Sequence, residues 1–356
     1  MRMLSAARPK WQDSLNSDRK ARGSDEVSRR TRLSVLTALC AATLLAAGCG
    51  ATTERPEGQD SGGGGGGGGE ECTPGEISDA PLPKPLVVDA PADDALANMV
   101  PAKYKADGKI VVATDATYPP IEFTLEGSNE ILGMDVDLGK AVGKVLGVEV
   151  EFVNASFDGI LAGLQAGRYE LGMSSFTDTK EREQTVDFVT YFEAGTSTMV
   201  RKCNPEGIKT TEDLCGKTVG AENGTTQLDQ LTKPDVEGSV VKACTDAGKE
   251  EVKAQGFPKQ TDVNAALAAN RIDAYLADTP VVNYSVKTTG NAFEKVGEDT
   301  DAAPYGIAVP KNAGTLKDAV QGAVQQLISD GNYQKILDNW GLTGAIEESE
   351  INGAIY

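Results

Sequence analysis

The 356-residue sequence contains no histidine, and this absence narrows the range of possible activities. Ser-His-Asp and Cys-His nucleophilic sites need an imidazole, and so does a His-ligated metal centre. Basic residues are also few, because 34 Lys and Arg stand against 53 Asp and Glu, a net charge of −19. Nucleic acid binding rests on cationic contacts with phosphates. The composition therefore disfavours nucleic acid, makes an enzyme the weaker hypothesis, and favours a small or cationic partner.

The N-terminal region has the pattern of an exported protein. Residues 33–48 form an apolar run of 16 that follows three arginines, which is too short for a comfortable membrane span and typical of a signal peptide. Leu45-Ala46-Ala47-Gly48-Cys49 resembles a bacterial lipobox, with Ala46 where a leucine-like residue is usual. The resemblance implies that Cys49 carries a lipid. The alternative is an ordinary leader with an incidental cysteine. Export by either the general or the twin-arginine route is consistent with the sequence.

A flexible tether is expected over residues 49–80, because Gly62–Gly69 is an uninterrupted run of eight glycines among polar residues. Residues 1–48 carry 9 basic and 4 acidic side chains, so their removal leaves 25 basic against 49 acidic groups, a net charge of −24. The mature part is thus predicted to be an acidic protein, held by a lipid anchor at the extracytoplasmic face of the cell membrane.

From residue 108 onward, short β-rich runs alternate with amphipathic helical stretches, which predicts parallel βαβ units and an α/β fold. The predicted strands cover residues 109–115, 148–153, 170–175, 217–221, 239–243, 272–278 and 305–310. The predicted helices cover residues 134–146, 158–166, 226–231, 262–269, 316–329 and 333–340. Residues 164–170 and 267–273 repeat a helix exit through Gly167 and Asn270, both suited to the left-handed conformation. This echo favours two lobes of similar build, with a cleft between them.

Polar side chains follow the predicted strands where such a cleft would open. A free amino acid offers a carboxylate, which suits the guanidinium of Arg182 and the backbone of residues 224–226. Its ammonium suits Asp278 with the hydroxyls of Ser174 and Thr177. Taken singly, Arg182 fits a surface ion pair and Asp278 a helix cap. Their coincidence at strand ends in both lobes favours a site for a zwitterion.

Eight segments in order resemble the extracellular solute-binding proteins of family 3: TDATYPPIEF, GMDVDLGKAV, SSFTDTKER, VDF, GKTVGAENGTTQ, RIDAYLADTP, YGIAVPK and DGNYQKILDNWG. The resemblance runs from about Lys109 to Gly341, and the cysteine-bearing form is similar to an actinobacterial branch. It implies a two-lobed periplasmic-binding-protein (type II, Venus-flytrap) α/β fold that closes on a polar amino acid for an ABC transporter. The implied organisation is a signal peptide (1–48), the tether (49–80), lobe 1 (81–199 plus 307–356) and lobe 2 (200–306).

The resemblance also assigns roles to individual positions. Arg182 matches the arginine that grips the α-carboxylate, and Asp278 the aspartate that takes the α-ammonium. The other matched positions line the head group, sandwich the side chain or lie near its distal end: Ser174, Ser175, Thr177, Thr226, Tyr118, Phe157, Asp115 and Glu222. The chain departs from the family at Tyr191-Phe192, where a Pro-Tyr pair is usual, and at Glu222. Together, Asp115 and Glu222 favour a cationic side chain such as arginine or lysine, although Glu222 could equally face solvent.

The sequence has six cysteines, and once the leader with Cys40 is removed, four remain besides Cys49. This even number favours disulfides in an oxidising compartment, with three pairings possible. The resemblance favours a Cys215–Cys244 bridge, which leaves Cys72 with Cys203. We expect no metal, no cofactor and no covalent chemistry, and a monomer that delivers a free amino acid to its permease. Two alternatives use the same fold: a cyclohexadienyl dehydratase-like enzyme with Glu122 or Glu222 as general acid, and an amino-acid sensor module.

Overall fold

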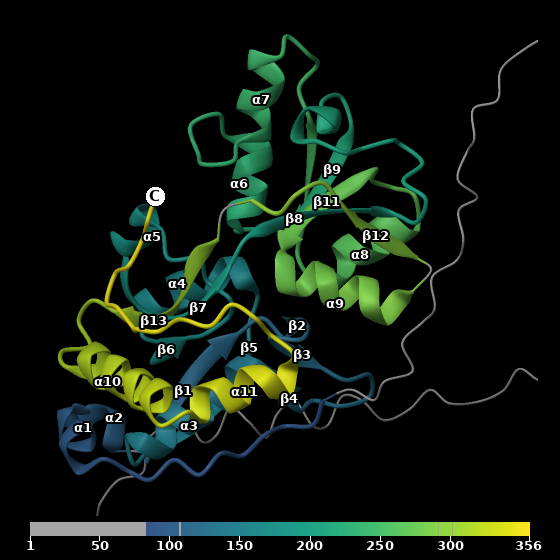
Figure 1. Ribbon diagram of the computed structural model, residues 1–356. Helices are drawn as coiled ribbons and strands as arrows, with labels where there is room; N and C mark the ends of the chain where they lie inside the picture. Colours follow the sequence, from purple (N-terminus) through teal and green to yellow (C-terminus); the bar gives the residue numbers. More distant parts are fainter. Residues whose placement is uncertain (1–82, 107, 291, 301) are drawn as a thin grey trace, which may run out of the picture. The chain divides into compact units, whose positions relative to one another are not determined.

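The computed structural model describes residues 83–106, 108–290, 292–300 and 302–356. Predictions that concern the signal peptide, Cys49, the tether and Cys72 lie outside the described residues. The described part belongs to one compact unit and contains two five-stranded sheets and one three-stranded sheet (Figure 1). Within this part of the chain no helix is long and apolar enough to cross a bilayer.

Lobe 1 is built on a sheet with the strand order β5-β1-β6-β13-β7. Strands β5, β1 and β6 are parallel, and β13 is antiparallel to its neighbours β6 and β7. The bounds are β1 Lys109–Thr114, β5 Glu149–Asn154, β6 Leu171–Gly172, β7 Val186–Ala194 and β13 Ala303–Pro310. A small antiparallel sheet beside it consists of β2 Thr117–Tyr118, β3 Glu122–Thr124 and β4 Ile131–Leu132.

Amphipathic helices cover this sheet. In α3, Leu138, Val142 and Val145 recur at helical spacing and are buried, as the apolar pattern predicts. Helices α3, α10 and α11 pack together in the large core of lobe 1, and α4 packs against β1, β6 and β13. The helix bounds are α1 Asp94–Met99, α2 Ala102–Lys105, α3 Met134–Val145, α4 Phe157–Gln165, α5 Lys180–Glu183, α10 Leu316–Ser329 and α11 Asn332–Trp340.

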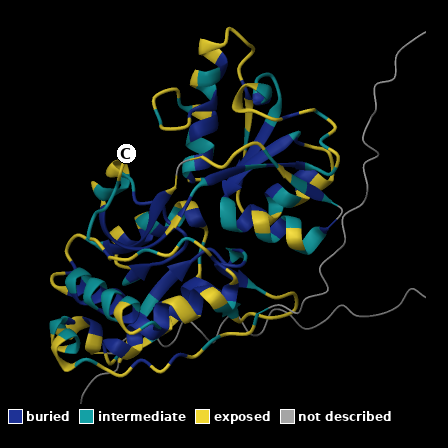
Figure 2. Cartoon of the chain, in the orientation of Figure 1, coloured by how far each residue is buried: buried dark blue, intermediate teal, exposed yellow. Residues whose placement is uncertain are grey.

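Lobe 2 repeats this plan on a sheet with the order β10-β9-β11-β8-β12. Its strands are β8 Thr196–Arg201, β9 Thr218–Glu222, β10 Lys253–Phe257, β11 Ala274–Asp278 and β12 Phe293–Val296. Its helices are η1 Thr211–Leu214, α6 Thr226–Thr232, α7 Val240–Asp246, α8 Gln260–Ala268 and α9 Thr279–Thr289. Two apolar clusters of buried residues form its core. Figure 2 shows the central strands of both sheets as buried and the outer loops as exposed.

One predicted strand is wrong. Residues 239–243 were expected to be extended because of the β-branched pair Val240-Val241, but they begin helix α7. Ser239 caps this helix by accepting a hydrogen bond from the Lys242 N–H, and Val240 and Cys244 are buried one helical turn apart. The strand of that region is β10, whose mostly exposed residues give no apolar pattern.

The chain crosses between the lobes twice. It leaves lobe 1 at the end of β7 and enters lobe 2 at β8, with only Gly195 between them, and it returns between β12 and β13. The predicted boundaries at 199/200 and 306/307 fall inside β8 and β13, a few residues after each crossing, and stay predictions. The departure at Tyr191-Phe192 does not interrupt β7, because both side chains are buried and the Tyr191 hydroxyl donates to Asp135 at 2.9 Å.

The echoed helix exits are present in both lobes. Helix α4 ends at Gln165, and Gly167, two residues later, has φ +68°. Helix α8 ends at Ala268, and Asn270, two residues later, has φ +57°. Each left-handed residue turns the chain towards the next central strand, β6 or β11. The local prediction is therefore confirmed.

The predicted disulfide between Cys215 and Cys244 is present and joins the end of η1 to α7. Cys203 is itself disulfide-bonded, but Cys72 lies outside the described residues, so their pairing stays a prediction.

The bridge between Cys215 and Cys244 closes a loop with a sequence separation of 29. We expect the double variant Cys215→Ala/Cys244→Ala to lose about 3–4 kcal/mol of unfolding free energy, because the unfolded chain gains loop entropy. Urea unfolding at equal ionic strength measures this, and a loss below about 1 kcal/mol would contradict the loop-entropy explanation.

Candidate functional site

A cavity between the lobes is lined by all ten residues that the sequence predicts to bind the ligand. The space between its lining atoms is about 310 Å³, divided into narrow gaps between side chains. The lining residues are Asp115, Tyr118, Glu122, Phe157, Ser174, Ser175, Thr177, Arg182, Glu222, Thr225, Thr226, Gln227 and Asp278. Ten of them were predicted, whereas Glu122, Thr225 and Gln227 were not. The structure thus brings the predicted residues together, while their role in binding stays a prediction.

Strand topology explains why residues far apart in sequence meet here. Asp115 follows the last residue of β1, and Ser174 lies two residues beyond β6. In lobe 2, Glu222 and Asp278 are the last residues of β9 and β11. In each lobe these strands are parallel neighbours, so their carboxyl ends open at one edge of the sheet. The two edges face the same cavity.

Asp278 stands between the two lobes. Its carboxylate accepts hydrogen bonds from the Tyr118 hydroxyl at 2.9 Å and from the Gln227 amide at 2.8 Å. The residue stands at the N-cap position of α9, but its side chain makes no capping hydrogen bond, so the interpretation of this carboxyl as a helix cap is wrong. Burial raises the pKa of Asp278 to about 6. At neutral pH this carboxyl is therefore mostly ionised and ready to hold a cation.

Arg182 reaches the cavity from α5. Its guanidinium donates to the main-chain oxygen of Thr177 at 2.8 Å and, across the cleft, to that of Gly224 at 2.9 Å. It also lies over the rings of Phe157 and Phe176, at 5.7 Å from each centroid. Among the described residues it forms no ion pair, which removes the surface ion-pair interpretation. Two carbonyl contacts orient the guanidinium and leave its positive charge unpaired by any carboxylate.

Aromatic and hydroxyl groups complete this end of the cavity. Phe157 is buried and stacks on Phe176 with ring centroids 4.6 Å apart, so it is both a core residue and a cavity wall. Thr177 of lobe 1 and Thr226 of lobe 2 bring their hydroxyl oxygens to 3.5 Å from each other. Thr225 caps α6 by accepting from the Leu228 N–H. The threonine pair is thus one of the points at which the two lobes approach each other.

Ser174 and Ser175 are engaged with a buried acid. Both hydroxyls donate to Glu122, at 3.1 and 3.2 Å. Behind Glu122 lies Asp135, which accepts from Tyr191 at 2.9 Å. Burial and then the charge of Asp135 raise the pKa of Glu122 well above its usual range, and burial raises the pKa of Asp135 to about 7. The pair therefore retains at least one proton at neutral pH.

A second pair of acids, Asp115 and Glu222, lines the part of the cavity that is predicted to receive the distal end of the ligand side chain. Asp115 accepts from the Phe157 N–H at 3.0 Å and so also holds the start of α4. Glu222 is 3% exposed, which excludes the interpretation that it faces solvent. Burial and then the charge of Asp115 raise the pKa of Glu222 to about 9. One oxygen of each carboxyl, Asp115 Oδ1 and Glu222 Oε1, is buried without a hydrogen-bond partner among the described residues.

The residues missed by sequence analysis had only weak signals. Gln227 is the last residue of the family-like segment GKTVGAENGTTQ. An amide in the first turn of a helix, however, gives no reason to expect a bond to Asp278, 51 residues away. Glu122 sits in a short strand and was considered only as an acid for the enzyme alternative. Within the described part of the chain, no group of three acidic or thiol side chains forms a metal site.

Two α/β lobes that enclose a polar cavity define a bilobal solute-binding protein. The chain belongs to the bacterial extracellular solute-binding proteins, family 3, whose model matches residues 110–343.

Named relatives share most of this region. An arginine-binding protein, ArgT, of Corynebacterium glutamicum is 31% identical over 71% of this chain and 81% of its own length. An L-cystine-binding protein, TcyJ, of Escherichia coli is 32% identical over 70% of this chain and 87% of its own length. Among solved structures, an ancestral arginine-binding protein bound to arginine matches with a TM-score of 0.58 and 38% identity, over 65% of this chain and 98% of that chain. The two-lobed fold predicted from the sequence is thereby confirmed, and the named relatives are binding proteins.

Proposed function

We propose that this protein captures a cationic amino acid, arginine or lysine, at the extracytoplasmic face of the cell membrane and delivers it to the permease of an ABC importer. Arg182 binds the α-carboxylate with the help of Thr226, and Asp278 binds the α-ammonium. Tyr118 and Phe157 enclose the aliphatic part of the side chain. Asp115 and Glu222 receive its distal charge. Closure of the lobes then places one half of these contacts on each side of the ligand.

The observation that carries the proposal is the excess of carboxyl groups over basic groups in the cavity. Four carboxyl groups line it, those of Asp115, Glu122, Glu222 and Asp278, against the single guanidinium of Arg182. Glu122 is already hydrogen-bonded to two serines, but Asp115 and Glu222 each keep a buried oxygen without a donor. Leaving a buried acceptor unsatisfied costs about 1–3 kcal/mol. A ligand that brings N–H donors and positive charge removes this cost, whereas an anionic side chain would increase it.

The names of the relatives support the ligand class without fixing it. Two of the three relatives described above are named for arginine and one for cystine. Cystine carries the same α-carboxylate and α-ammonium, but its distal end holds a second ammonium together with a second carboxylate. Two buried acids would repel that second carboxylate, whereas arginine and lysine present a positive charge alone. The Asp115–Glu222 pair distinguishes the two possibilities and supports a cation.

The remaining parts of the proposal rest on the sequence. A lipid on Cys49 and the tether over residues 49–80 would keep the receptor near its permease, and we propose that it acts as a monomer without metal or cofactor. We also propose binding without turnover. At neutral pH Glu122 holds a proton, as a general acid must, but both serine hydroxyls already donate to it and it lies against Asp135.

Calorimetry with L-arginine, L-lysine, L-citrulline, L-glutamine and L-glutamate tests the proposal. Citrulline is the matched control, because it has the shape of arginine without the charge. We expect arginine or lysine to bind at least about 100-fold more tightly than citrulline, since a charged hydrogen bond to a buried acid contributes about 3 kcal/mol. Equal affinity for citrulline would contradict the cationic assignment. Failure of all five ligands, or turnover of prephenate or arogenate, would contradict the receptor function.

A further inference from the structure

Residues 344–356 form a tail that continues beyond the region matched to the family, residues 110–343. In Figure 1 this tail, in yellow, follows α11, runs beside β7 and reaches α5. Strand β7 is an edge strand of the lobe 1 sheet, and the tail lies antiparallel to it, with a β-bridge between Val189 and Ile351. The tail therefore covers the unpaired edge of the sheet.

Specific hydrogen bonds fix the course of the tail. The Thr190 N–H donates to the Glu350 oxygen at 2.9 Å, and the Ser349 hydroxyl donates to the Thr190 oxygen at 2.7 Å. Asn352 is bonded on three sides: its N–H to the Phe188 oxygen at 2.9 Å, its side-chain oxygen to the Phe188 N–H at 2.9 Å, and its side-chain amide to Asp187 at 3.1 Å. The tail thus has one register along β7.

The far end of the tail is attached to the segment that carries Arg182. The Gly353 N–H donates to Asp178 at 2.8 Å, and the Ala354 N–H donates to Glu183 at 3.2 Å. The Lys180 N–H donates to the main-chain oxygen of Tyr356 at 3.1 Å. These three contacts lie on both sides of Arg182 in the sequence. The tail therefore holds α5 in place and ends next to the ligand cavity.

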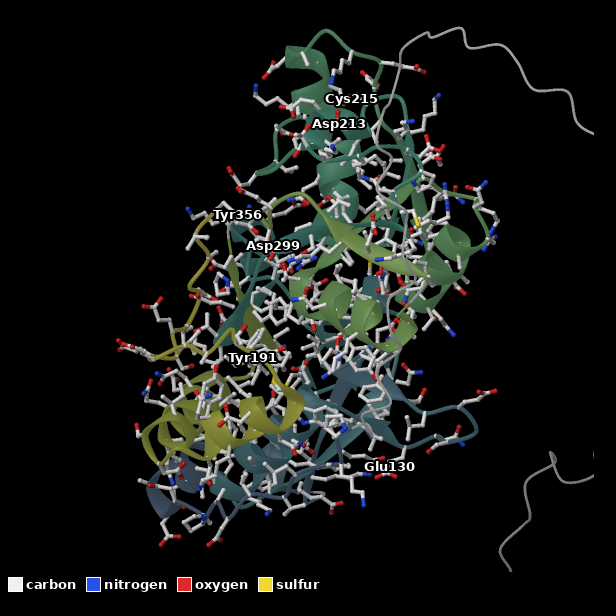
Figure 3. The ribbon with its side chains drawn as sticks, turned by 45° about the vertical axis from the view of Figure 1, so that its right-hand side comes forward. Glu130, Tyr191, Asp213, Cys215, Asp299 and Tyr356 are labelled. Carbon is white, nitrogen blue, oxygen red and sulfur yellow. A yellow bond between two sulfur atoms is a disulfide. The ribbon has the colours of Figure 1, made fainter. Side chains whose placement is uncertain are left out.

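Tyr356 lines a second cavity, in which the space between the lining atoms is about 700 Å³, and which we call the vestibule. The vestibule shares Thr177, Thr226, Gln227 and Asp278 with the ligand cavity, so it adjoins the end where the α-carboxylate and α-ammonium would lie. Its other walls include Gln230 and Glu237 of lobe 2 and Asp299, which Figure 3 shows near Tyr356. Tyr356 is 36% exposed. A residue attached to lobe 1 thus lines a space whose opposite wall belongs to lobe 2.

The electrostatic surroundings of Tyr356 agree with this position. Burial and then the negative charge of Asp278 raise the pKa of the Tyr356 hydroxyl, and the positive charge of Arg182 opposes the rise. Glu237 of lobe 2 adds a further negative charge nearby. The phenol therefore stays neutral at physiological pH and lies within electrostatic range of both head-group residues.

We infer that the tail is a gate for the ligand cavity, in which Tyr356 closes the vestibule across the two lobes and slows release of the bound amino acid. This inference rests on the proposed function, because it assigns a role at the same site. The tail acts as a positioning element: it fixes α5 through main-chain contacts and places the Tyr356 ring where the ligand head group would leave. Opening of the lobes must then separate Tyr356 from Gln230 and Glu237.

Release of radiolabelled L-arginine, chased with excess unlabelled L-arginine, tests the gate in the full mature chain. For Tyr356→Ala we expect release about tenfold faster with little change in the association rate, because a lost aromatic contact at one site acts mainly on dissociation. Its thermal midpoint should stay within about 1 °C of the unchanged protein, since a ring that is 36% exposed adds little to the core. Tyr356→Phe should release at nearly the original rate, because the ring supplies the closure.

Ile355→Ala is the matched control, since Ile355 lies on the same tail and is 57% exposed. A second variant, Asn352→Ala, removes two side-chain hydrogen bonds of the tail far from the vestibule and should also speed release. Unchanged release in Tyr356→Ala, or an equal acceleration in Ile355→Ala, overturns the gate while leaving the receptor function intact. Failure of the unchanged protein to retain L-arginine contradicts the proposed function instead.

Discussion

Replacing Asp278 with asparagine should weaken the binding of L-arginine about 100- to 5,000-fold, because removing one partner of a buried, hydrogen-bonded charge pair costs about 3–5 kcal/mol. Asparagine keeps the shape of the side chain, and one oxygen can still accept from Tyr118 or Gln227. The packing of the cavity should therefore survive, and the loss should report on the missing negative charge. Isothermal titration calorimetry at pH 7.5, well above the pKa of about 6, measures it.

Asp246→Asn is the control for this change, since Asp246 lies on α7 of the same lobe and its side chain is 64% exposed. It should bind L-arginine as the unchanged protein does. The thermal midpoint of unliganded Asp278→Asn should not fall, because burial disfavours the charge that the substitution removes. If Asp278→Asn bound L-arginine within about threefold of the unchanged protein, the ammonium of the ligand would have to lie elsewhere, and the zwitterion arrangement would be wrong.

The contacts around Asp278 also explain how ligand capture and lobe closure are coupled. Tyr118 belongs to lobe 1, whereas Asp278 and Gln227 belong to lobe 2, so the Tyr118 bond crosses the cleft. The bond from Arg182 to the Gly224 oxygen crosses it in the same direction, from a donor in lobe 1 to an acceptor in lobe 2. A ligand whose carboxylate attracts Arg182 and whose ammonium attracts Asp278 adds two further links between the lobes. Closure is then stabilised by the two charges that distinguish a free amino acid from other small solutes.

The sequence predicted most of the fold because its signals are local. Helix α10 was predicted with the bounds it has, since its apolar residues recur at helical spacing over 14 residues. The helix exits at Gly167 and Asn270 were predicted because few residues adopt the left-handed conformation without strain. Helix α7 was missed because two adjacent valines favour a strand, while the capping serine and the burial of Cys244 favour a helix.

The site was predicted less completely, because its geometry depends on contacts between distant segments. Strand ends indicated Asp115 and Asp278, and the family resemblance indicated Glu222. The bond between Gln227 and Asp278 depends on how α6 packs beside β11, which no local pattern encodes. The serines line the cavity, and their hydroxyls donate to Glu122, a contact between distant segments that no local pattern indicated. The tail along β7 carried no sequence signal of its own.

Glu222→Gln should remove the preference for cationic ligands and much of the pH dependence of binding. The pKa of Glu222 is about 9, so below pH 9 this carboxyl is mostly protonated, and a bound cation must displace the proton. Affinity for L-arginine should therefore rise with pH between 6.5 and 8.5, by at most about tenfold per unit, with release of up to one proton per ligand. In Glu222→Gln the affinity should fall about 10- to 100-fold and become nearly independent of pH over this range.

The raised pKa of Glu222 also determines how the stability of the folded protein changes with pH. The unfolded chain loses the Glu222 proton near its usual pKa of 4.5, whereas the folded, unliganded protein keeps it until about 9. The folded state binds more protons in this window, so this group makes unfolding easier as the pH rises from about 4.5 to about 9. Glu222→Gln should accordingly raise the thermal midpoint of the unliganded protein at pH 8.5, while Glu212→Gln, an exposed glutamate of the same lobe, should change neither midpoint nor affinity. Calorimetry in two buffers of different ionisation enthalpy counts the protons released, and an identical count in Glu222→Gln and the unchanged protein would place the titrating group elsewhere.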